Sequence, residues 1–211
     1  MPLHVDAQRD RTLLDAVTDG TTSRSRRGGL IPAANGDGER AYSIYVADGY
    51  GALLRAGRVR GLVGPGDLVA GTFANAPAWT PPVIEALSPL AVVHANRETV
   101  LDVLRHDVAS LEMALQALDL EARMPEMDHA PADVRLARAL RWGSNAIGRK
   151  AADGRTELPS CIPHRIWASW AGLHRSTVTT MLNEWIFDGR VDQRGRALLL
   201  NDTGSLPGEA R

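Results

Sequence analysis

Residues 162–185 constrain the fold more than any other part of this sequence, because they have the pattern of two short amphipathic helices broken by a glycine. In the first half, Ile166, Trp167 and Trp170 form an apolar stripe at helical spacing. In the second half, apolar residues recur at steps of three and four, namely Val178, Met181, Leu182 and Trp185. The break falls at Gly172. This layout predicts a helix-turn-helix.

The outward face of the second predicted helix carries short polar side chains and one arginine: Arg175, Ser176, Thr179 and Thr180. Such groups suit hydrogen bonding to base edges and phosphates in a major groove. Residues 187–200 then place a turn at Gly195 between two short apolar strands, and this hairpin predicts a winged helix-turn-helix. Any small helical pair with a central glycine would share the first part of the pattern. The Asp188-Gly189 helix end and the basic hairpin that follow favour the winged motif.

The motif resembles the CRP/FNR family of bacterial transcription factors, named after the cyclic-AMP receptor and fumarate-nitrate regulator. That family typically has a Gly-x-Ser-Arg-x-Thr-Val-x-Arg-x-Leu core and a Gly-Arg or Gly-Lys wing. Residues 172–182 are similar to this core, and Gly195-Arg196 is similar to the wing turn. His174 stands where the family usually has Ser, and Thr180 where it usually has Arg. The family's usual DNA half-site is therefore not carried over.

The resemblance implies a role for each matching residue. Arg175 is expected to read bases, Ser176 to contact a base or a phosphate, and Thr177 to contact a phosphate. Charge alone places Arg194 and Arg196 near phosphates beside the wing. The full predicted set of DNA-binding residues is His164, His174, Arg175, Ser176, Thr177, Thr179, Thr180, Arg194 and Arg196.

Residues 96–124 predict a long helix that forms a homodimer. Between Asn96 and Arg123 there is no Gly or Pro, and an apolar seam repeats at steps of three and four. Its members are Leu101, Leu104, Val108, Leu111, Leu115 and Leu118. A helix lying only on its own domain's core is the alternative, but that would usually show a broader apolar face. Met113, Ala114 and Ala117 broaden the face somewhat, so the helix is expected to contact both its own domain and a partner. A two-fold dimer would present two recognition helices to a palindromic operator.

Residues 130–204 are predicted to form the DNA-binding domain. Residues 131–142 are expected to start the first helix of this domain, with Asp133 in its first turn. Asp153-Gly154 and Leu158-Pro159 resemble the hairpin that precedes the family's helix-turn-helix. A hinge is expected over residues 123–130.

Residues 1–95 predict a β-roll sensor-like domain, so that the whole chain has an α+β fold. Residues 41–93 hold short apolar runs at roughly ten-residue spacing, which is typical of an antiparallel barrel or double-sheet roll. Residues 64–68 and 86–93 are similar to the Pro-Gly-Asp turn and closing strands of the family's jelly-roll domain, whereas residues 1–40 are expected to be loop-rich. The predicted strands are Tyr42 to Ala47, Ala52 to Leu54, Val59 to Val63, Asp67 to Val69, Val83 to Leu87 and Ala91 to His94.

Cyclic AMP is not an expected ligand. The family's nucleotide cassette has a Gly-Glu pair and an Arg followed by Ser or Thr, but here Gly71 precedes Thr72. No arginine or lysine occurs from Ala70 to Ile84, and a buried phosphate without a cation is strongly disfavoured. Pro2, His4 and His94 could in principle ligate haem, yet a lone strand histidine is usually structural. No cofactor is therefore predicted.

Composition narrows the remaining function classes. The sequence contains no catalytic motif and a single cysteine, Cys161, so neither an enzyme nor a metal site is expected. The net charge is only -1, and no apolar run reaches membrane-spanning length. The N-terminus lacks a secretory pattern, which predicts a cytoplasmic protein that associates with the nucleoid when DNA-bound.

These patterns lead to one main hypothesis and one alternative. The main hypothesis is a homodimeric, sequence-specific DNA-binding transcription regulator, with RNA polymerase as a candidate further partner. The alternative is a small-molecule-binding dimer whose winged helix contacts protein instead of DNA.

Overall fold

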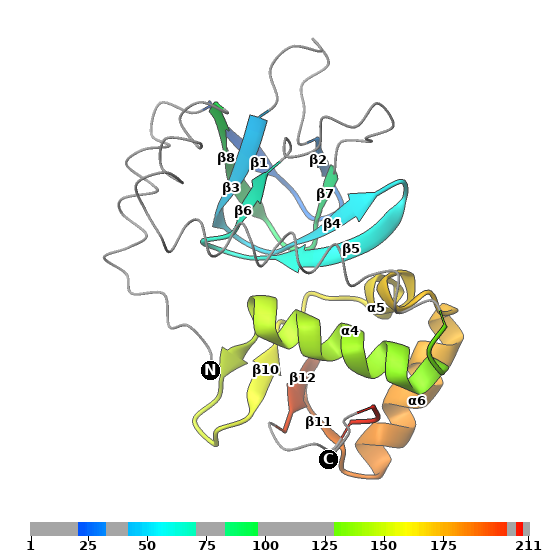
Figure 1. The fold of residues 1–211 in the computed structure, drawn as a ribbon. Coiled ribbons are helices and arrows are strands. Elements are labelled where there is room, and N and C mark those ends of the chain that lie inside the picture. The colour runs from blue at the N-terminus through cyan, green and yellow to red at the C-terminus, as the bar shows by residue number, and fades with distance from the viewer. Residues whose placement is uncertain (1–20, 33–41, 71–82, 97–128, 202–205, 209–211) are drawn as a thin grey trace. The chain divides into compact units, whose positions relative to one another are not determined.

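The computed structural model describes residues 21–32, 42–70, 83–96, 129–201 and 206–208. Its internal contacts divide the chain into two compact units. One comprises Met1–Gly57 and Val63–Ala122, and the other comprises Arg58–Leu62 and Arg123–Arg211 (Figure 1).

The strands between residues 21 and 96 form two four-stranded sheets, with the orders β1-β8-β3-β6 and β2-β7-β4-β5. Neighbouring strands run antiparallel where their register is defined, as in β1 with β8, β3 with β6 and β8, and β7 with β2 and β4. The strands are β1 (Thr21–Ser25), β2 (Leu30–Pro32), β3 (Tyr42–Asp48), β4 (Gly51–Arg55), β5 (Arg58–Val63), β6 (Leu68–Ala70), β7 (Val83–Ala86) and β8 (Leu90–Asn96).

Alternating apolar residues from both sheets form the core of this β domain. Ile44 and Val46 on β3, Ile84 on β7 and Val92 on β8 are all fully buried. Because side chains of a strand alternate between two faces, residues two apart such as Ile44 and Val46 enter the same core. Each of the six predicted strands is present, and the predicted double-sheet roll is confirmed.

The expectation of a loop-rich segment over residues 1–40 is wrong for part of that range. β1 pairs with β8 from Thr21↔His94 to Ser25↔Leu90, and β2 pairs with β7. The sequence of β1, Thr-Thr-Ser-Arg-Ser, has no apolar residue, so a hydrophobic pattern cannot reveal it. Backbone hydrogen bonds to β8 hold it in the sheet instead.

The Pro-Gly-Asp turn predicted before β6 is a hydrogen-bonded turn. Pro65 occupies its second position and Gly66, with φ +95°, its third, as a type II turn requires. The Asp67 N–H donates to the Gly64 carbonyl at 3.1 Å, and the Gly64 N–H donates to an Asp67 carboxylate oxygen at 2.7 Å. Asp67 therefore closes the turn on both sides.

The second unit contains three described helices and a four-stranded sheet with the order β11-β12-β10-β9 (Figure 1). Adjacent strands in this sheet are antiparallel. Its elements are α4 (Ala132–Ile147), β9 (Arg149–Lys150), β10 (Thr156–Leu158), α5 (His164–Ala171), α6 (Arg175–Phe187), β11 (Val191–Arg194) and β12 (Ala197–Leu200).

Helix α4 confirms the helix predicted to start in residues 131–142, and it extends to Ile147. Leu136, Leu140 and Gly143 lie on its buried side, at the spacing of one helical face. Gly143 lies inside the helix rather than at its end, at a position where another helix leaves no room for a side chain. A Cβ at this position would lie 2.6 Å from the Trp167 ring.

The predicted dimerisation helix and most of the hinge lie outside the described residues, together with Pro2 and His4. None of the helices in the described ranges has the length and apolar character that crossing a bilayer requires.

Candidate nucleic-acid interface

Helices α5 and α6 pack together through the apolar stripes that the sequence predicts. Ile166, Trp167 and Trp170 of α5 are buried, and so are Val178, Leu182 and Trp185 of α6, whereas Met181 is half-buried. The Trp167 and Trp170 rings stack with centroids 6.0 Å apart and an interplanar angle of 10°. Such aromatic contacts contribute buried area and directional ring interactions, here within the apolar face that α5 presents to the core.

Gly172 makes the turn between the two helices possible. It ends α5 in the left-handed conformation, with φ 62° and ψ 37°, which glycine adopts without steric cost. Arg135 of α4 supports this turn, because its Nη1 donates hydrogen bonds to the carbonyls of Ala171 at 3.1 Å and Gly172 at 3.0 Å. These bonds satisfy carbonyls that a helix end leaves unpaired.

The first turn of α6 is exposed. His174, Arg175, Ser176 and Thr180 are exposed, and Thr177 and Thr179 are half-buried. Opposite to them on the helix lie the buried Val178, Leu182 and Trp185. The structure thus brings most of the predicted α6 contact residues to one solvent-facing surface, from which they can reach a ligand.

The N-terminus of α6 keeps backbone donors available, because the side chain of its N-cap residue, His174, does not cap it. His174 Nδ1 instead contacts the Ser176 hydroxyl at 2.8 Å. The Ser that the CRP/FNR pattern usually has at position 174 is a strong capping residue. Uncapped amide groups at a helix N-terminus, aided by the helix dipole, favour an anion such as phosphate.

His164 and Thr179 form a second polar contact beside this turn. His164 Nδ1 lies 3.0 Å from Thr179 Oγ1, and the Thr179 hydroxyl donates to the Arg175 carbonyl at 3.1 Å. A hydroxyl has one hydrogen, so in this arrangement His164 Nδ1 must carry the proton. Burial, followed by the positive charge of Arg175, lowers the pKa of His164. The neutral imidazole consequently has an acceptor at Nε2.

The β11–β12 hairpin turns at Gly195, whose φ is +64°. Gln193 Nε2 donates to the Gly195 carbonyl at 2.7 Å and stabilises the turn. Arg196 next to it is exposed, and within the described part of the chain no ion pair involves it. Arg196 is therefore placed at the hairpin tip as a free cation.

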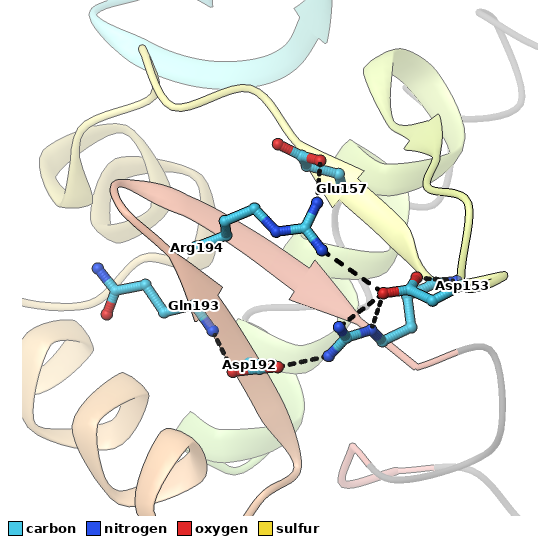
Figure 2. Close-up of polar contacts among 6 residues, drawn as sticks. Asp153, Glu157, Asp192, Gln193 and Arg194 are labelled. Atoms are coloured by element: carbon cyan, nitrogen blue, oxygen red, sulfur yellow. Dashed lines mark hydrogen bonds and ion pairs between the residues drawn. The ribbon is translucent and has the colours of Figure 1, made fainter.

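Arg194 is engaged differently from Arg196. Its guanidinium lies 3.6 Å from Asp153 Oδ2 and 3.7 Å from Glu157 Oε2. Figure 2 shows this side chain extending from β11 toward Asp153 and Glu157, on the β10 side of the sheet. The sequence gives Arg194 and Arg196 the same expected role. The structure distinguishes them, since two carboxylates already accept the charge of Arg194.

Sequence reasoning did not single out Arg155, which is central to this group of charges. Arg155 donates to Asp153 Oδ2 at 2.7 Å and to Asp192 Oδ2 at 2.5 Å. A signal for it is present in the chain. Asp153, Arg155 and Glu157 alternate, as do Asp192 and Arg194, and residues two apart lie on one face of a strand.

The β domain presents no comparable cluster in its described ranges. No group of three or more His, Cys, Asp or Glu residues suited to a metal occurs among the described residues of the chain. His94 Nε2 contacts the Ser23 hydroxyl at 3.1 Å, and burial lowers the pKa of His94. This contact gives the histidine a structural partner. Residues 71–82, which hold most of the segment without basic residues, are outside the described ranges.

No protein-family model and no curated protein matches the sequence. Solved structures do match in fold. A cyclic nucleotide-binding domain containing protein from Listeria monocytogenes EGD-e aligns with a TM-score of 0.70 and 14% identity, over 92% of this chain and 98% of that one. FixK2 from Bradyrhizobium japonicum aligns with a TM-score of 0.68 and 20% identity, over 91% and 99%.

TTHA1359 from Thermus thermophilus, a transcriptional regulator of the CRP/FNR family, aligns with a TM-score of 0.59 and 22% identity, over 86% of this chain and 94% of that one. The chain has the CRP/FNR fold. The resemblance that the helix pair and hairpin indicate is thus confirmed at the level of the fold.

Proposed function

We propose that this chain is a homodimeric transcription regulator that binds a palindromic DNA operator in a sequence-specific manner. The observation that supports this most directly is the exposed first turn of α6. It combines Arg175 and Ser176 with uncapped backbone amides, and Thr180 follows in the second turn, all on the side opposite the buried face of the helix. α5, α6 and the β11–β12 hairpin form the winged helix-turn-helix of this proposal, and we call the hairpin the wing.

The contacts divide between base reading and phosphate binding. Arg175 reads base edges from the major groove, where a bidentate arginine distinguishes guanine from the other bases. Ser176, Thr177 and the amides at the start of α6 bind the adjacent phosphate backbone. Arg196 at the tip of the wing binds a flanking phosphate. Thr179 stabilises α6 rather than contacting DNA, because its hydroxyl already forms hydrogen bonds with the Arg175 carbonyl and His164.

The chemistry at two contact positions differs from the usual family pattern. Thr180 presents a hydroxyl and a methyl group where an arginine is usual, so this position favours a thymine methyl or a water-mediated contact over a guanine. His174 replaces the usual serine cap. The operator therefore differs from the family's usual half-site at the bases facing these residues.

Selection of bound sequences from a random duplex pool tests sequence-specific binding. We expect enrichment of a two-fold symmetric site whose half-sites lie about one helical turn apart. Failure to bind any duplex at low salt would contradict the proposal and favour a winged helix that docks on protein.

Arg175→Ala tests the assigned base reading. We expect a loss of about 1 to 3 kcal/mol on the selected site and a much smaller loss on random DNA, measured by fluorescence anisotropy. Equal losses on both duplexes would mean that Arg175 binds phosphate only.

We further propose that cyclic AMP does not control this regulator. No basic residue occurs from Ala70 to Ile84, where a cyclic phosphate would need one. Isothermal titration with cyclic AMP should show no binding at micromolar concentration. A micromolar dissociation constant would overturn this part of the proposal.

A cytoplasmic location and contact with RNA polymerase follow from the regulator role and belong to the same proposal.

A further inference from the structure

One face of the β11-β12-β10-β9 sheet carries alternating charges that lie opposite each other across strands. Asp192 on β11 and Glu157 on β10 are both in register with Leu199 of β12, so the three residues form a row across the sheet. Arg194 and Arg155 lie two residues away from this row, on the same face. The two arginines thus flank β12 from opposite sides, each near carboxylates of the other strand.

The two arginine side chains cross β12 in opposite directions. From the β10 side, Arg155 Nη1 reaches Asp192 on β11 at 2.5 Å, while its Nη2 and Nε hold Asp153 at 2.7 and 3.0 Å. From β11, Arg194 reaches Glu157 at 3.7 Å and Asp153 at 3.6 Å (Figure 2). We call these five residues, Asp153, Arg155, Glu157, Asp192 and Arg194, the crossed brace.

The two arginines contribute unequally to the brace. Arg155 binds Asp153 through two nitrogens, whereas both contacts of Arg194 exceed 3.5 Å. Charge-assisted bonds at 2.5 to 3.0 Å are much stronger than ion pairs at longer distance. In agreement with this, Arg155 lowers the pKa of Asp153 to about 2 and is the main cause of the lowered pKa of Asp192. Arg155 is therefore the principal connection between β11 and the β9–β10 hairpin.

β11 needs such a connection because it is the edge strand of the sheet. It has four residues and pairs with β12 alone, through registers from Val191↔Leu200 to Arg194↔Ala197. An edge strand has a hydrogen-bonded neighbour on one side only. Three of the four β11 side chains are exposed, so packing contributes little, and the brace supplies the additional contact.

We propose that Arg155 is a positioning residue for DNA binding, which holds β11 against the β9–β10 hairpin so that Arg196 at the wing tip meets a phosphate. This inference rests on the proposed function. Arg155 itself does not touch DNA in this arrangement. Its effect on affinity therefore passes through Arg196.

A double-mutant cycle in the full-length protein tests this route. Arg155→Ala and Arg196→Ala should each weaken binding to the selected operator, by roughly threefold to fivefold in fluorescence anisotropy. In the Arg155→Ala background, removal of Arg196 should cost less than about twofold, because the tip is no longer held in place. Independent, multiplicative losses would overturn the positioning role, and so would an Arg155→Ala protein with wild-type affinity.

Matched variants separate positioning from loss of charge or of folding. Arg190→Ala removes an exposed cation that lies 3.4 Å from Asp188, outside the crossed brace, and should leave affinity within about twofold of the wild type. Arg155→Lys keeps the charge, but an ammonium group lacks the planar set of donors with which a guanidinium binds two carboxylates. It should therefore lower operator affinity as much as Arg155→Ala does. Wild-type affinity of Arg155→Lys would show that charge alone matters and would overturn the proposal.

Asp192→Asn removes the cross-strand partner and leaves Arg155 in place, which covers the case in which Arg155→Ala fails to fold. In the Asp192→Asn background, Arg196→Ala should again reduce operator affinity by less than it does in the wild type. The same loss of affinity in both backgrounds would overturn the proposal. The outcome also separates the two levels of inference. Wild-type protein that binds no duplex contradicts the proposed function itself, whereas wild-type binding with an additive cycle contradicts only the role of Arg155.

Discussion

His164 combines a defined tautomer with a position beside the α6 contact surface. Its Nδ1–H is committed to Thr179, so Nε2 can donate to a phosphate only after the ring takes up a proton. Burial and Arg175 lower its pKa in the free protein. A phosphate bound beside the ring, as proposed, would raise this pKa because a nearby negative charge favours the protonated form. We therefore expect the proposed DNA binding to be accompanied by proton uptake at this residue.

We predict that operator affinity increases as the pH falls from about 8 to about 6. The folding stability of the free protein depends on pH in the opposite direction from the affinity. Because the pKa of His164 is lowered in the folded protein, its contribution to stability is complete above pH 6.5 and is lost as the pH falls and the ring is protonated. His164→Asn cannot be protonated and should give a flatter affinity profile, measured by anisotropy across this range. His129→Asn, at an exposed position outside the interface, should keep the wild-type profile. Identical profiles for wild type and His164→Asn would refute this role.

Asp67 is a second residue whose protonation matters, this time for stability. Burial raises its pKa to about 6, against the opposing hydrogen bond from the Gly64 N–H. A raised pKa means that the residue's contribution to stability is complete at low pH and is lost as the pH rises through about 6.

Asp67→Asn should therefore be more stable than the wild type at pH 8 and equal to it near pH 4. The difference is up to about 2 kcal/mol, because partial solvent exposure of Asp67 reduces the effect. Urea unfolding at both pH values measures it. A constant difference between the two proteins across this range would contradict the assignment.

At the scale of elements, α4 and α5 depend on close approach at Gly143. A Cβ there would lie 2.6 and 2.8 Å from two Trp167 ring atoms, and a stacked, buried tryptophan has little room to move. We predict that Gly143→Ala destabilises the second unit by about 1 to 3 kcal/mol despite the better helix propensity of alanine.

Gly154→Ala is the matched control for this substitution. Gly154 has φ +84° in the turn between β9 and β10, and a Cβ would meet no atom within 4 Å. It should cost only the backbone preference, roughly 1 kcal/mol. Thermal unfolding of both variants compares them, and a smaller loss for Gly143→Ala than for Gly154→Ala would contradict the packing argument.

The elements differ in how visible they are from sequence. α5 and α6 could be predicted because burial of one helix face demands apolar residues at steps of three and four, which Ile166, Trp170, Val178 and Leu182 satisfy. β1 could not, because a polar strand at a sheet edge is held by backbone hydrogen bonds that any sequence can make. The packing role of Gly143 could not be predicted either, because it depends on the Trp167 ring of another helix.

At the scale of the whole molecule, the proposed dimer rests on the apolar seam of residues 96–124, which lie outside the described ranges. We predict that Leu111→Glu, at the middle of the seam, converts a dimer into a monomer in sedimentation velocity. Affinity for a palindromic operator should fall by about tenfold or more, since the two half-sites are no longer bound together. Glu112→Gln, one position off the seam, should leave both properties unchanged. A Leu111→Glu protein that remains dimeric would contradict the predicted interface.

The sequence by itself determined the fold class of this protein, the order of its described elements from β3 onward and the surface of α6 that faces solvent. These properties follow from local periodicity and turn chemistry, which are properties of neighbouring residues such as Gly172, Gly195 and the apolar positions of α6. Only the tertiary structure decided which charged side chains meet. Arg194 and Arg196 are two residues apart in one basic hairpin, yet Arg194 lies with Asp153 and Glu157 because β12 brings β10 beside it. Contacts between residues about forty positions apart depend on strand order and register, and the local pattern around each residue does not contain them.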